Sequence, residues 1–405
     1  MRVYAISIKG TISDAREESM IANRKGFRPY GAVVAVGVFL SSTFFVAADE
    51  VGTSGVRLLS GGDFVSIDVS CDAEAATCPA GLAPGAVARQ TGLRGINARG
   101  DVVGFYVDSA NRQHGFVRKD GRYTTIDFPL AGIRGMVANG INPQGEIVGQ
   151  YVLPINPNVE ESSPLFCPEN LPNGTANPAC IKGFHYRNGE YTTIMFSGHP
   201  GAIPQRITAN GEIHGCLHDR DLGTSMYGAT WRRSFGPQGS VYIADAYSLE
   251  ANGGELADSS MAVTMSMNNG GTLNGHSIVG LYTDMLGQPR GYVVRNGVFE
   301  EYNASDEALP ANLTAIWDMN PQGHFVGNFR GQGEAAARRH GFLDRDAGSP
   351  RIAFDITVRD ASGNTVTALA TAAFGINPDG FIVGQYLLAT GGALHGFIAA
   401  PLNGN

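Results

Sequence analysis

Three residues of metal-ligating type alternate along one short stretch of this chain of 405 residues. The stretch reads Ile213-His214-Gly215-Cys216-Leu217-His218, and in an extended strand His214, Cys216 and His218 point to the same face. Imidazole and thiolate groups are good ligands for zinc or copper. Alternate residues of a strand lie about 6–7 Å apart, which suits two ligands better than three. A transition-metal site and a buried free cysteine both fit this pattern.

Three aspartates occupy one equivalent place in a pattern that recurs along the chain, namely Asp108, Asp219 and Asp284. Each follows a strand-like run of the type Ile-Val-Gly-x-Tyr, at the point where that run should meet a variable loop. Carboxylate oxygens at this point could hold Ca²⁺. Together with His218, these aspartates are the candidate ligand-binding residues, and ordinary turn chemistry is the alternative.

The sequence contains no P-loop, no Gly-x-Ser-x-Gly elbow and no His-Glu-x-x-His pair. A catalytic interpretation would instead need non-repeated charged residues that converge on one point. The residues to inspect for this are His199, His218, Asp219, Arg220 and Asp221. The sequence therefore assigns no catalytic residue.

The candidate residues belong to a unit that occurs six times. Its first segment is a strand that ends in Ile or Met, followed by a tight turn and then by Ile-Val-Gly-x-Tyr. The strand ends lie at Ile96, Ile141, Ile207, Met267, Met319 and Ile376. Turns such as Asn142-Pro143-Gln144-Gly145 are typical of hairpins, because Gly supplies a positive φ and Pro presets its own.

Two further segments complete the unit. One is His-Gly-Phe, as at His114, His340 and His395. The other is of the Thr-Thr-Ile-Asp type, with copies at Phe64–Asp68, Tyr123–Asp127, Tyr191–Met195, Val241–Asp245, Phe299–Tyr302 and Ile352–Asp355. We interpret the repeated His as a strand-start contact and the repeated Asp as a hydrogen-bonding strand end. A ring of carboxylates around a cation is the alternative for the Asp.

Four strands in each of six units predict an all-β fold, a six-bladed β-propeller with four antiparallel strands per blade. The order of the segments supports this. The first Thr-Thr-Ile-Asp copy, at 64–68, precedes every inner strand, and the last unit ends at His395-Gly396-Phe397 without such a copy. Pairing of this N-terminal strand with the last blade would close the ring and limit exposed strand edges.

The lengths of the connections distinguish two faces of the expected propeller. Turns within the first and the second hairpin of each unit are short, whereas the other connections vary widely and lie on the opposite face. We call that face the variable-loop face. Two of its insertions each contain a close cysteine pair, Cys71 with Cys78 and Cys167 with Cys180, which predicts two local disulfides and leaves Cys216 over. Binding usually resides on such loops, so we expect the site there, near the axis.

The combination of Gly-Ile-Asn-x-x-Gly-x-Ile-Val-Gly-x-Tyr, His-Gly-Phe and Thr-Thr-Ile-Asp resembles the bacterial extracellular repeat family named for a His-Ala-Phe (HAF) motif. The resemblance extends from about Phe64 to Pro401, with Gly in place of Ala in the tripeptide. It implies a secreted β-propeller and assigns no catalytic residue.

The N-terminal segment is typical of an export signal. A basic flank precedes the uncharged run from Gly31 to Ala48, and small residues precede Asp49. We expect a signal peptide at 1–48, a linker at 49–63, the propeller at 64–401 and a tail at 402–405. Met20 is an alternative start, and an uncleaved anchor is the alternative to cleavage. The net charge of −8 becomes −11 without 1–48, which has six basic and three acidic residues.

The sequence therefore favours a secreted or periplasmic monomer without a nucleic-acid partner and without stable membrane insertion after cleavage. The first hypothesis is non-catalytic binding of a glycan, a peptide or a surface partner through the variable-loop face. The alternative is an extracellular hydrolase or lyase, with or without a metal ion, with its site at the axial mouth. Fold alone does not decide between them, and Ca²⁺ and a transition metal are the only cofactors that the residues suggest.

Overall fold

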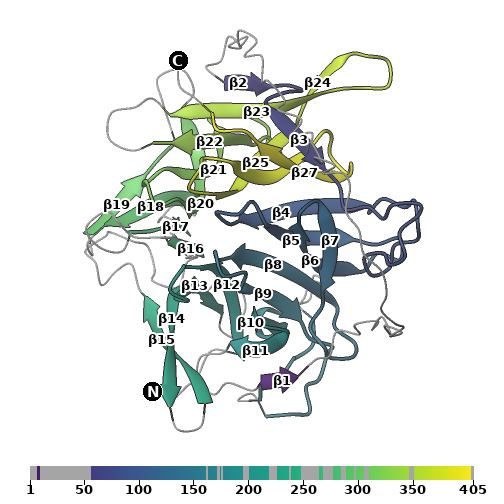
Figure 1. Cartoon of the computed structure of the whole chain (residues 1–405). Helices are drawn as coiled ribbons and strands as arrows, with labels where there is room; N and C mark the ends of the chain where they lie inside the picture. The colour runs from purple at the N-terminus through teal and green to yellow at the C-terminus, as the bar shows by residue number, and fades with distance from the viewer. Residues whose placement is uncertain are drawn as a thin grey trace, which may run out of the picture.

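The chain forms a ring of six small β-sheets around a common axis (Figure 1). The computed structural model describes residues 7–9, 56–160, 163–170, 174, 177–194, 200–218, 226–236, 239–247, 264–267, 277–283, 289–295, 298–304, 310–345 and 351–402. Within these ranges the regular structure is almost entirely β, with one short 3₁₀ turn, η1 (Pro178–Cys180). No helix in them is long and apolar enough to span a bilayer.

Each sheet is one blade, and in blades 1 to 5 the four strands of the repeat follow the chain order outward from the axis. Blade 1 contains β4 (Gln90–Ile96), β5 (Val102–Val107), β6 (Gln113–Lys119) and β7 (Arg122–Ile126). Blade 2 contains β8 (Gly135–Ile141), β9 (Ile147–Val152), β10 (Ile181–Arg187) and β11 (Glu190–Ile194). Blade 3 contains β12 (Gly201–Ile207), β13 (Ile213–His218), β14 (Met226–Gly236) and β15 (Gly239–Tyr247).

The second half of the chain repeats this arrangement. Blade 4 contains β16 (Thr264–Met267), β17 (Ser277–Thr283), β18 (Pro289–Arg295) and β19 (Val298–Tyr302). Blade 5 contains β20 (Ala311–Met319), β21 (Phe325–Gly331), β22 (His340–Asp344) and β23 (Ile352–Arg359). Blade 6 contains β25 (Ala370–Ile376), β26 (Ile382–Leu387), β27 (Leu394–Ala399) and, from the N-terminal side, β3 (Phe64–Ile67).

The inner strand of each blade contacts the inner strand of the next, all the way around the axis. In Figure 1 the labels β4, β8, β12, β16, β20 and β25 surround the centre. Each of these strands ends at the Ile or Met that marks the repeat in the sequence. The six-bladed, four-stranded architecture predicted from the repeat is therefore confirmed.

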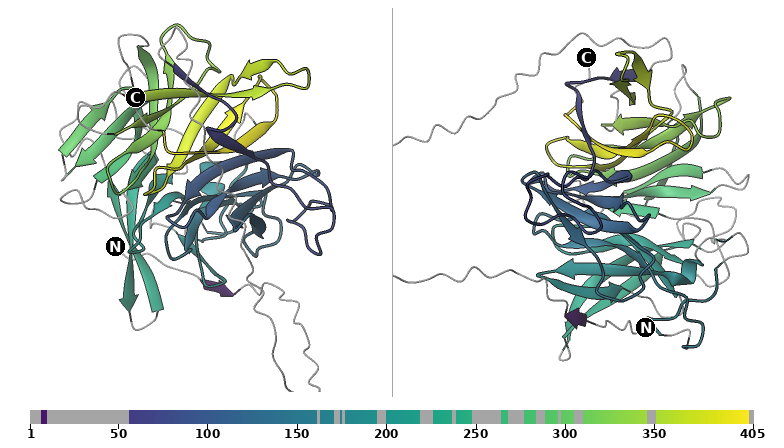
Figure 2. Two further views of the ribbon diagram at one scale, coloured as in Figure 1. Left: turned by 45° about the horizontal axis from the view of Figure 1, so that its top comes forward. Right: turned by 90° about the vertical axis from the view of Figure 1, so that its right-hand side faces the viewer.

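Ring closure joins segments that lie more than 300 residues apart. Strand β3 pairs antiparallel with β27, with Phe64 opposite Ala399 and Ile67 opposite Gly396. In Figure 2 this N-terminal strand lies along the C-terminal strands of the last blade. The predicted closure is confirmed.

Three short strands were not expected from the sequence. Strand β2 (Val56–Leu59) lies within the expected linker and pairs parallel with the outer strand of blade 5. Strand β24 (Thr365–Thr367) extends the same blade. Strand β1 (Ser7–Lys9) lies within the expected signal peptide and pairs with the outer edge of blade 2, whose four own strands form a complete blade without it.

In the core, the phenylalanine of the His-Gly-Phe segment packs over the glycine of the Ile-Val-Gly segment. Phe116, Phe184, Phe342 and Phe397 of the His-Gly-Phe copies are fully buried. In blade 2, a Cβ atom placed on Gly149 would lie 2.8 Å from the ring of Phe184 and would overlap the carbonyl oxygen of Val137. The middle of Ile-Val-Gly must therefore lack a side chain so that the aromatic ring can pack over it.

A chain of asparagine side chains links neighbouring blades at the short-turn face. The side-chain oxygen of Asn142 accepts the backbone N–H groups of Gln144 and Glu146, which fixes its own turn. Its Nδ2 donates to the carbonyl oxygen of Thr208 in the next blade at 3.3 Å. The same donation from one blade to the next runs from Asn97 to Asn142, from Asn320 to Asn377 and from Asn377 to Asn97.

We predict that Asn142→Ala lowers the free energy of unfolding by about 2 kcal/mol or more, because it leaves buried backbone groups in two blades without partners. Urea denaturation monitored by circular dichroism would measure this. The matched control is Gln144→Ala in the same turn, whose side chain is exposed and which should change stability by about 0.5 kcal/mol or less. Equal effects of the two variants would show that the asparagine chain does not stabilise the ring.

Candidate functional site

The repeated Tyr, His and Asp of three different motif segments meet in one cluster on the variable-loop side of a blade. In blade 1, His114 Nδ1 lies 2.7 Å from Asp127 and Nε2 lies 3.2 Å from Asp108. The ring of Tyr106 stacks on the imidazole, with centroids 5.0 Å apart. The Tyr106 hydroxyl is 2.8 Å from the hydroxyl of Thr125. The motif residues thus hold β5, β6 and β7 of the blade together.

The same cluster recurs in blades 5 and 6. His340 Nδ1 lies 3.0 Å from Asp355, and its Nε2 lies 2.9 Å from Glu334. His395 Nδ1 lies 3.0 Å from Asp68, which comes from the strand that closes the ring. Each of these aspartates pairs with the histidine of its own blade. This arrangement supports the interpretation of the repeated Asp as a hydrogen-bonding strand end.

Carboxylates on both sides of His114 and of His340 favour the protonated form of each imidazole. Burial lowers the pKa of His114, but the hydrogen bonds and charges of Asp127 and Asp108 outweigh it, so the net pKa is raised. Burial likewise lowers the pKa of His340, and Asp355 and Glu334 raise it above its usual value. These histidines are therefore ion-pair partners in the fold.

The candidate Asp108 is engaged within the protein. Its side chain is fully buried and accepts hydrogen bonds from the backbone and side chain of Arg112 at 2.8 and 2.9 Å, besides that from His114. Burial raises the pKa of Asp108, but these bonds outweigh it and lower the pKa. It closes the turn from Asp108 to Arg112 as a turn residue does. Asp219 and Asp284 lie outside the described residues.

The alternating His214, Cys216 and His218 lie on β13 of blade 3, as expected. His214 is buried, with its Nε2 3.1 Å from Glu212 and its Nδ1 3.0 Å from the hydroxyl of Thr230. Cys216 is a buried cysteine outside any disulfide. For His218 only the backbone is described. No group of three or more His, Cys, Asp or Glu residues with the geometry to hold a metal ion occurs among the residues that the structure describes.

Both predicted disulfides are present. Cys71 is bonded to Cys78 in the link between β3 and β4, and Cys167 is bonded to Cys180 in the link between β9 and β10. Each bridge fixes an insertion on the variable-loop face. Cys167 and Cys180 are fully buried and pack into the core of blade 2. His199, Arg220 and Asp221 lie outside the described residues.

The backbones of neighbouring inner strands approach each other closely at the residue before the strand-end Ile or Met. The backbones of Gly375, Gly95, Gly140 and Arg206 follow one another there so closely that a Cβ on any of these glycines would lie within 3.2 Å of the next Cα. Glycine therefore occupies this layer in blades 1, 2 and 6. Blades 3 and 5 instead carry Arg206 and Asp318, which form a buried ion pair with Nε and Oδ1 3.2 Å apart.

The Arg206 guanidinium ties several blades together at this layer. It donates to the carbonyl oxygens of Asn139 at 2.9 Å and of Phe374. Asp318 accepts the backbone N–H of Ile376 at 3.1 Å. Burial raises the pKa of Asp318, and the charge of Arg206 opposes this effect. This pair was not predicted from the sequence, although two charged residues at a repeated glycine position were a visible signal.

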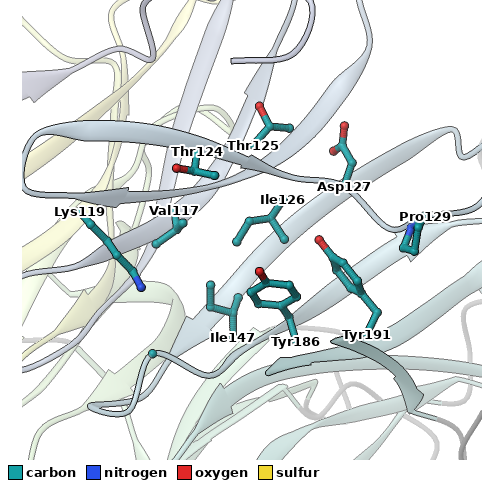
Figure 3. A pocket seen from close by; sticks show the side chains of 11 residues that line it. Val117, Lys119, Thr124, Thr125, Ile126, Asp127, Pro129, Ile147, Tyr186 and Tyr191 are labelled. Atoms are coloured by element: carbon teal, nitrogen blue, oxygen red, sulfur yellow. The ribbon is translucent and has the colours of Figure 1, made fainter. Parts of the chain in front are cut away.

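A cleft of about 380 Å³ lies between blades 1 and 2 (Figure 3). One wall is β6 and β7 of blade 1, and the other is the inner hairpin and the outer strands of blade 2. The described lining residues are Val117, Lys119, Thr124, Thr125, Ile126, Asp127, Pro129, Gly145, Ile147, Tyr186 and Tyr191. In Figure 3 the hydroxyl groups of both tyrosines are directed toward the strand that carries Ile126 and Asp127. Sequence reasoning placed the site at the axis and missed this cleft, which forms only when two blades pack side by side.

The comparisons with known proteins found neither a family model nor a curated protein that matches the chain. Among solved structures, AofleA from Arthrobotrys oligospora is 10% identical with a TM-score of 0.38 over 78% of this chain and 88% of that one. The SapL1 lectin in complex with α-methyl fucoside is 8% identical with a TM-score of 0.43 over 78% and 97%. A Trypanosoma rangeli sialidase with the inhibitor DANA is 8% identical with a TM-score of 0.38 over 83% and 59%. Likeness at this level carries no functional argument.

We predict strong coupling between Arg206 and Asp318. Asp318→Gly leaves a buried guanidinium without its counter-charge and should lower the free energy of unfolding by about 3–5 kcal/mol. The double variant Arg206→Gly/Asp318→Gly places in both blades the residue of blades 1, 2 and 6, and its loss should be smaller than the sum of the two single losses by at least about 1 kcal/mol. A double-mutant cycle from urea unfolding measures this, and strict additivity would contradict the pairing.

We also predict a pH-dependent contribution from His114. Its folded-state pKa is raised, so its stabilisation is complete below the unfolded-state pKa of about 6.5 and is lost as the pH rises through the folded-state value. The difference in unfolding free energy between the wild type and His114→Gln should therefore shrink as the pH rises above about 6.5. The control Asp120→Asn, an exposed turn residue, should give a constant difference. A difference in unfolding free energy between the wild type and His114→Gln that grows with pH would refute the role of His114 as a stabilising ion-pair partner.

Proposed function

We propose that this protein is an exported, non-catalytic propeller that binds a carbohydrate in the cleft between blades 1 and 2. The observation that carries the proposal is the composition of the cleft, in which tyrosine and aliphatic surface lies beside an oriented carboxylate, a threonine hydroxyl and a lysine. A sugar has C–H faces that pack on aromatic rings and hydroxyl groups that need donors and acceptors. The cleft offers both kinds of surface at once.

The apolar part of the cleft comes from blade 2. Tyr186 is half-buried and its ring lies 4.8 Å from that of the buried Tyr191. Burial raises the pKa of both phenols, so their hydroxyl groups stay protonated and can donate hydrogen bonds at neutral pH. Ile147 is buried beneath them. This rigid wall can pack against a pyranose ring at a small cost in side-chain entropy.

The polar part of the cleft comes from the outer strand of blade 1. The Asp127 side chain is 41% exposed, and His114 holds its Oδ2 at 2.7 Å. That ion pair fixes the orientation of the carboxylate while leaving it accessible to hydroxyl donors. Thr124 and Lys119 are exposed on the same wall and can bond further ring oxygens. Preorganised polar groups of this kind reduce the ordering cost of binding.

The chemistry of the cleft favours binding over hydrolysis. Glycosidases of the common type use two carboxyl groups that flank the scissile bond. Among the described residues that line this cleft, Asp127 supplies the one carboxyl group, and that group is already committed to His114. The alternative of a hydrolase or lyase at the axial mouth has no comparable support among the described residues, since Asp318 is buried in an ion pair there.

Export is supported by two features of the chain. Two disulfides are typical of proteins that fold in an oxidising compartment. The sequence also carries the expected signal at 1–48, which lies outside the described residues except for β1. We therefore place the carbohydrate outside the cytoplasm.

The test is a glycan array probed with the purified full chain, followed by calorimetric titration with the strongest binder. We expect Tyr186→Ala to weaken binding about tenfold or more, because it removes the exposed aromatic wall, a loss of about 1.4 kcal/mol. Asp127→Asn should also weaken binding, because the amide loses the oriented negative acceptor.

The matched control is Phe381→Ala, which removes an exposed aromatic ring outside the cleft and should leave affinity unchanged. Thermal unfolding of each variant separates misfolding from loss of binding. The absence of any binder on the array, or full affinity in Tyr186→Ala, would refute the cleft as a carbohydrate site. Turnover of a bound glycan would refute the non-catalytic assignment.

A further inference from the structure

The axial mouth on the variable-loop face has a floor formed by unpaired residues from five of the six inner strands. In five blades a register shift between the first two strands leaves a bulged residue. These residues are Arg94, Asn139, Gln205, Trp317 and Phe374. They precede the narrow glycine layer along each strand, so they lie on its variable-loop side. The glycine layer and the Arg206–Asp318 pair close the axis beneath them.

Arg94 is the charged residue of this floor. Its guanidinium carbon lies 3.9 Å from the centroid of the Phe374 ring and 5.3 Å from that of Phe105. The residue is half-buried, and within the described parts of the chain it has no hydrogen bond or ion pair to a carboxylate. Stacking on a ring covers the face of a guanidinium and leaves its N–H edges available.

The surrounding charge is positive. Arg206 and Asp318 neutralise each other, so Arg94 adds one uncompensated positive charge at the axis, counted over the described residues. Burial and the neighbouring charge of Arg206 lower the pKa of Arg94 to about 10. The guanidinium thus remains protonated at neutral pH, in a place where water screens it poorly. An anion that pairs with it would offset this cost.

Two neighbours add features that match a sugar acid. Trp317 is half-buried, and its ring lies 5.0 Å from that of Phe374, on which Arg94 stacks. The Oε1 atom of Gln385 is buried and has no hydrogen-bond partner among the described residues. It lies beside Gly92, two residues before Arg94 on the same strand.

We propose that the axial mouth is a second binding site, in which Arg94 takes the carboxylate of an acidic saccharide of the uronic acid type. The planar guanidinium presents two parallel N–H groups that fit the two oxygens of a carboxylate. The inference that the ligand is a saccharide rests on the proposed function. The inference that the ligand carries a carboxylate rests on Arg94 and its surroundings alone. The site is separate from the cleft between blades 1 and 2.

The experiment titrates the full chain with glucuronate, glucuronate methyl ester, glucose, acetate and inorganic phosphate, using calorimetry or saturation-transfer NMR. We expect glucuronate to bind and its neutral methyl ester to bind at least about tenfold more weakly, a comparison that needs no variant. Arg94→Gln should weaken glucuronate binding by a similar factor. The affinity of Arg94→Lys for glucuronate should lie between that of the wild type and that of Arg94→Gln, because the lysine keeps the charge and loses the paired donors. Phe381→Ala, which changes an exposed residue outside both sites, should leave glucuronate binding unchanged.

Each other outcome decides against the proposal in a defined way. Equal binding of glucuronate and its methyl ester, or full affinity in a folded Arg94→Gln, would exclude Arg94 as the carboxylate site. Preference for phosphate over glucuronate would exclude a carboxylate-selective site, and equal affinity for acetate would exclude recognition of the sugar. Loss of glucuronate binding in Tyr186→Ala would place the acid in the cleft, which would refute the axial site but not the proposed function.

Discussion

The ring depends on an amide that serves two blades at once. Each axial asparagine folds its own turn through its side-chain oxygen and reaches the next blade through its side-chain nitrogen. Because both functions use one buried residue, the shape of a turn and the angle between blades cannot vary independently. This coupling fixes how closely the inner strands approach, and that approach in turn requires glycine in the narrow layer. The floor of the axial mouth is a consequence of the same constraint.

The outer half of each blade follows a different rule. There the repeated Tyr, His and Asp bind strands together by stacking and ion pairing. Blade 2 departs from the rule, since the fully buried Lys182 replaces the histidine and donates to the carbonyl oxygen of Pro200 at 2.6 Å. The side of blade 2 that faces blade 1 also forms the cleft with Asp127. A departure from the repeat and the cleft thus involve neighbouring blades.

Sequence reasoning succeeded wherever a feature recurs at fixed spacing. The strand ends from Ile96 to Ile376, the closure by 64–67 and both disulfides all follow from periodicity and loop length. It failed for the cleft, because contacts between Tyr186 and the wall of blade 1 depend on the angle between blades. The sequence could not reveal the surroundings of His214 either, since a histidine in a strand looks the same whether its nitrogens are paired or open. Arg94 and Trp317 were hidden because each lies at a bulge, which the spacing does not reveal.

Strand β3 pairs with β27, which is synthesised much later, and this has a consequence for the folding of the new chain. The strand that completes blade 6 is among the first of the body to emerge, and the three strands that it joins are among the last. Such a long sequence separation makes closure a slow, entropically costly event. In each newly made molecule, β3 must therefore remain without its partner until the last strands of the body have been synthesised.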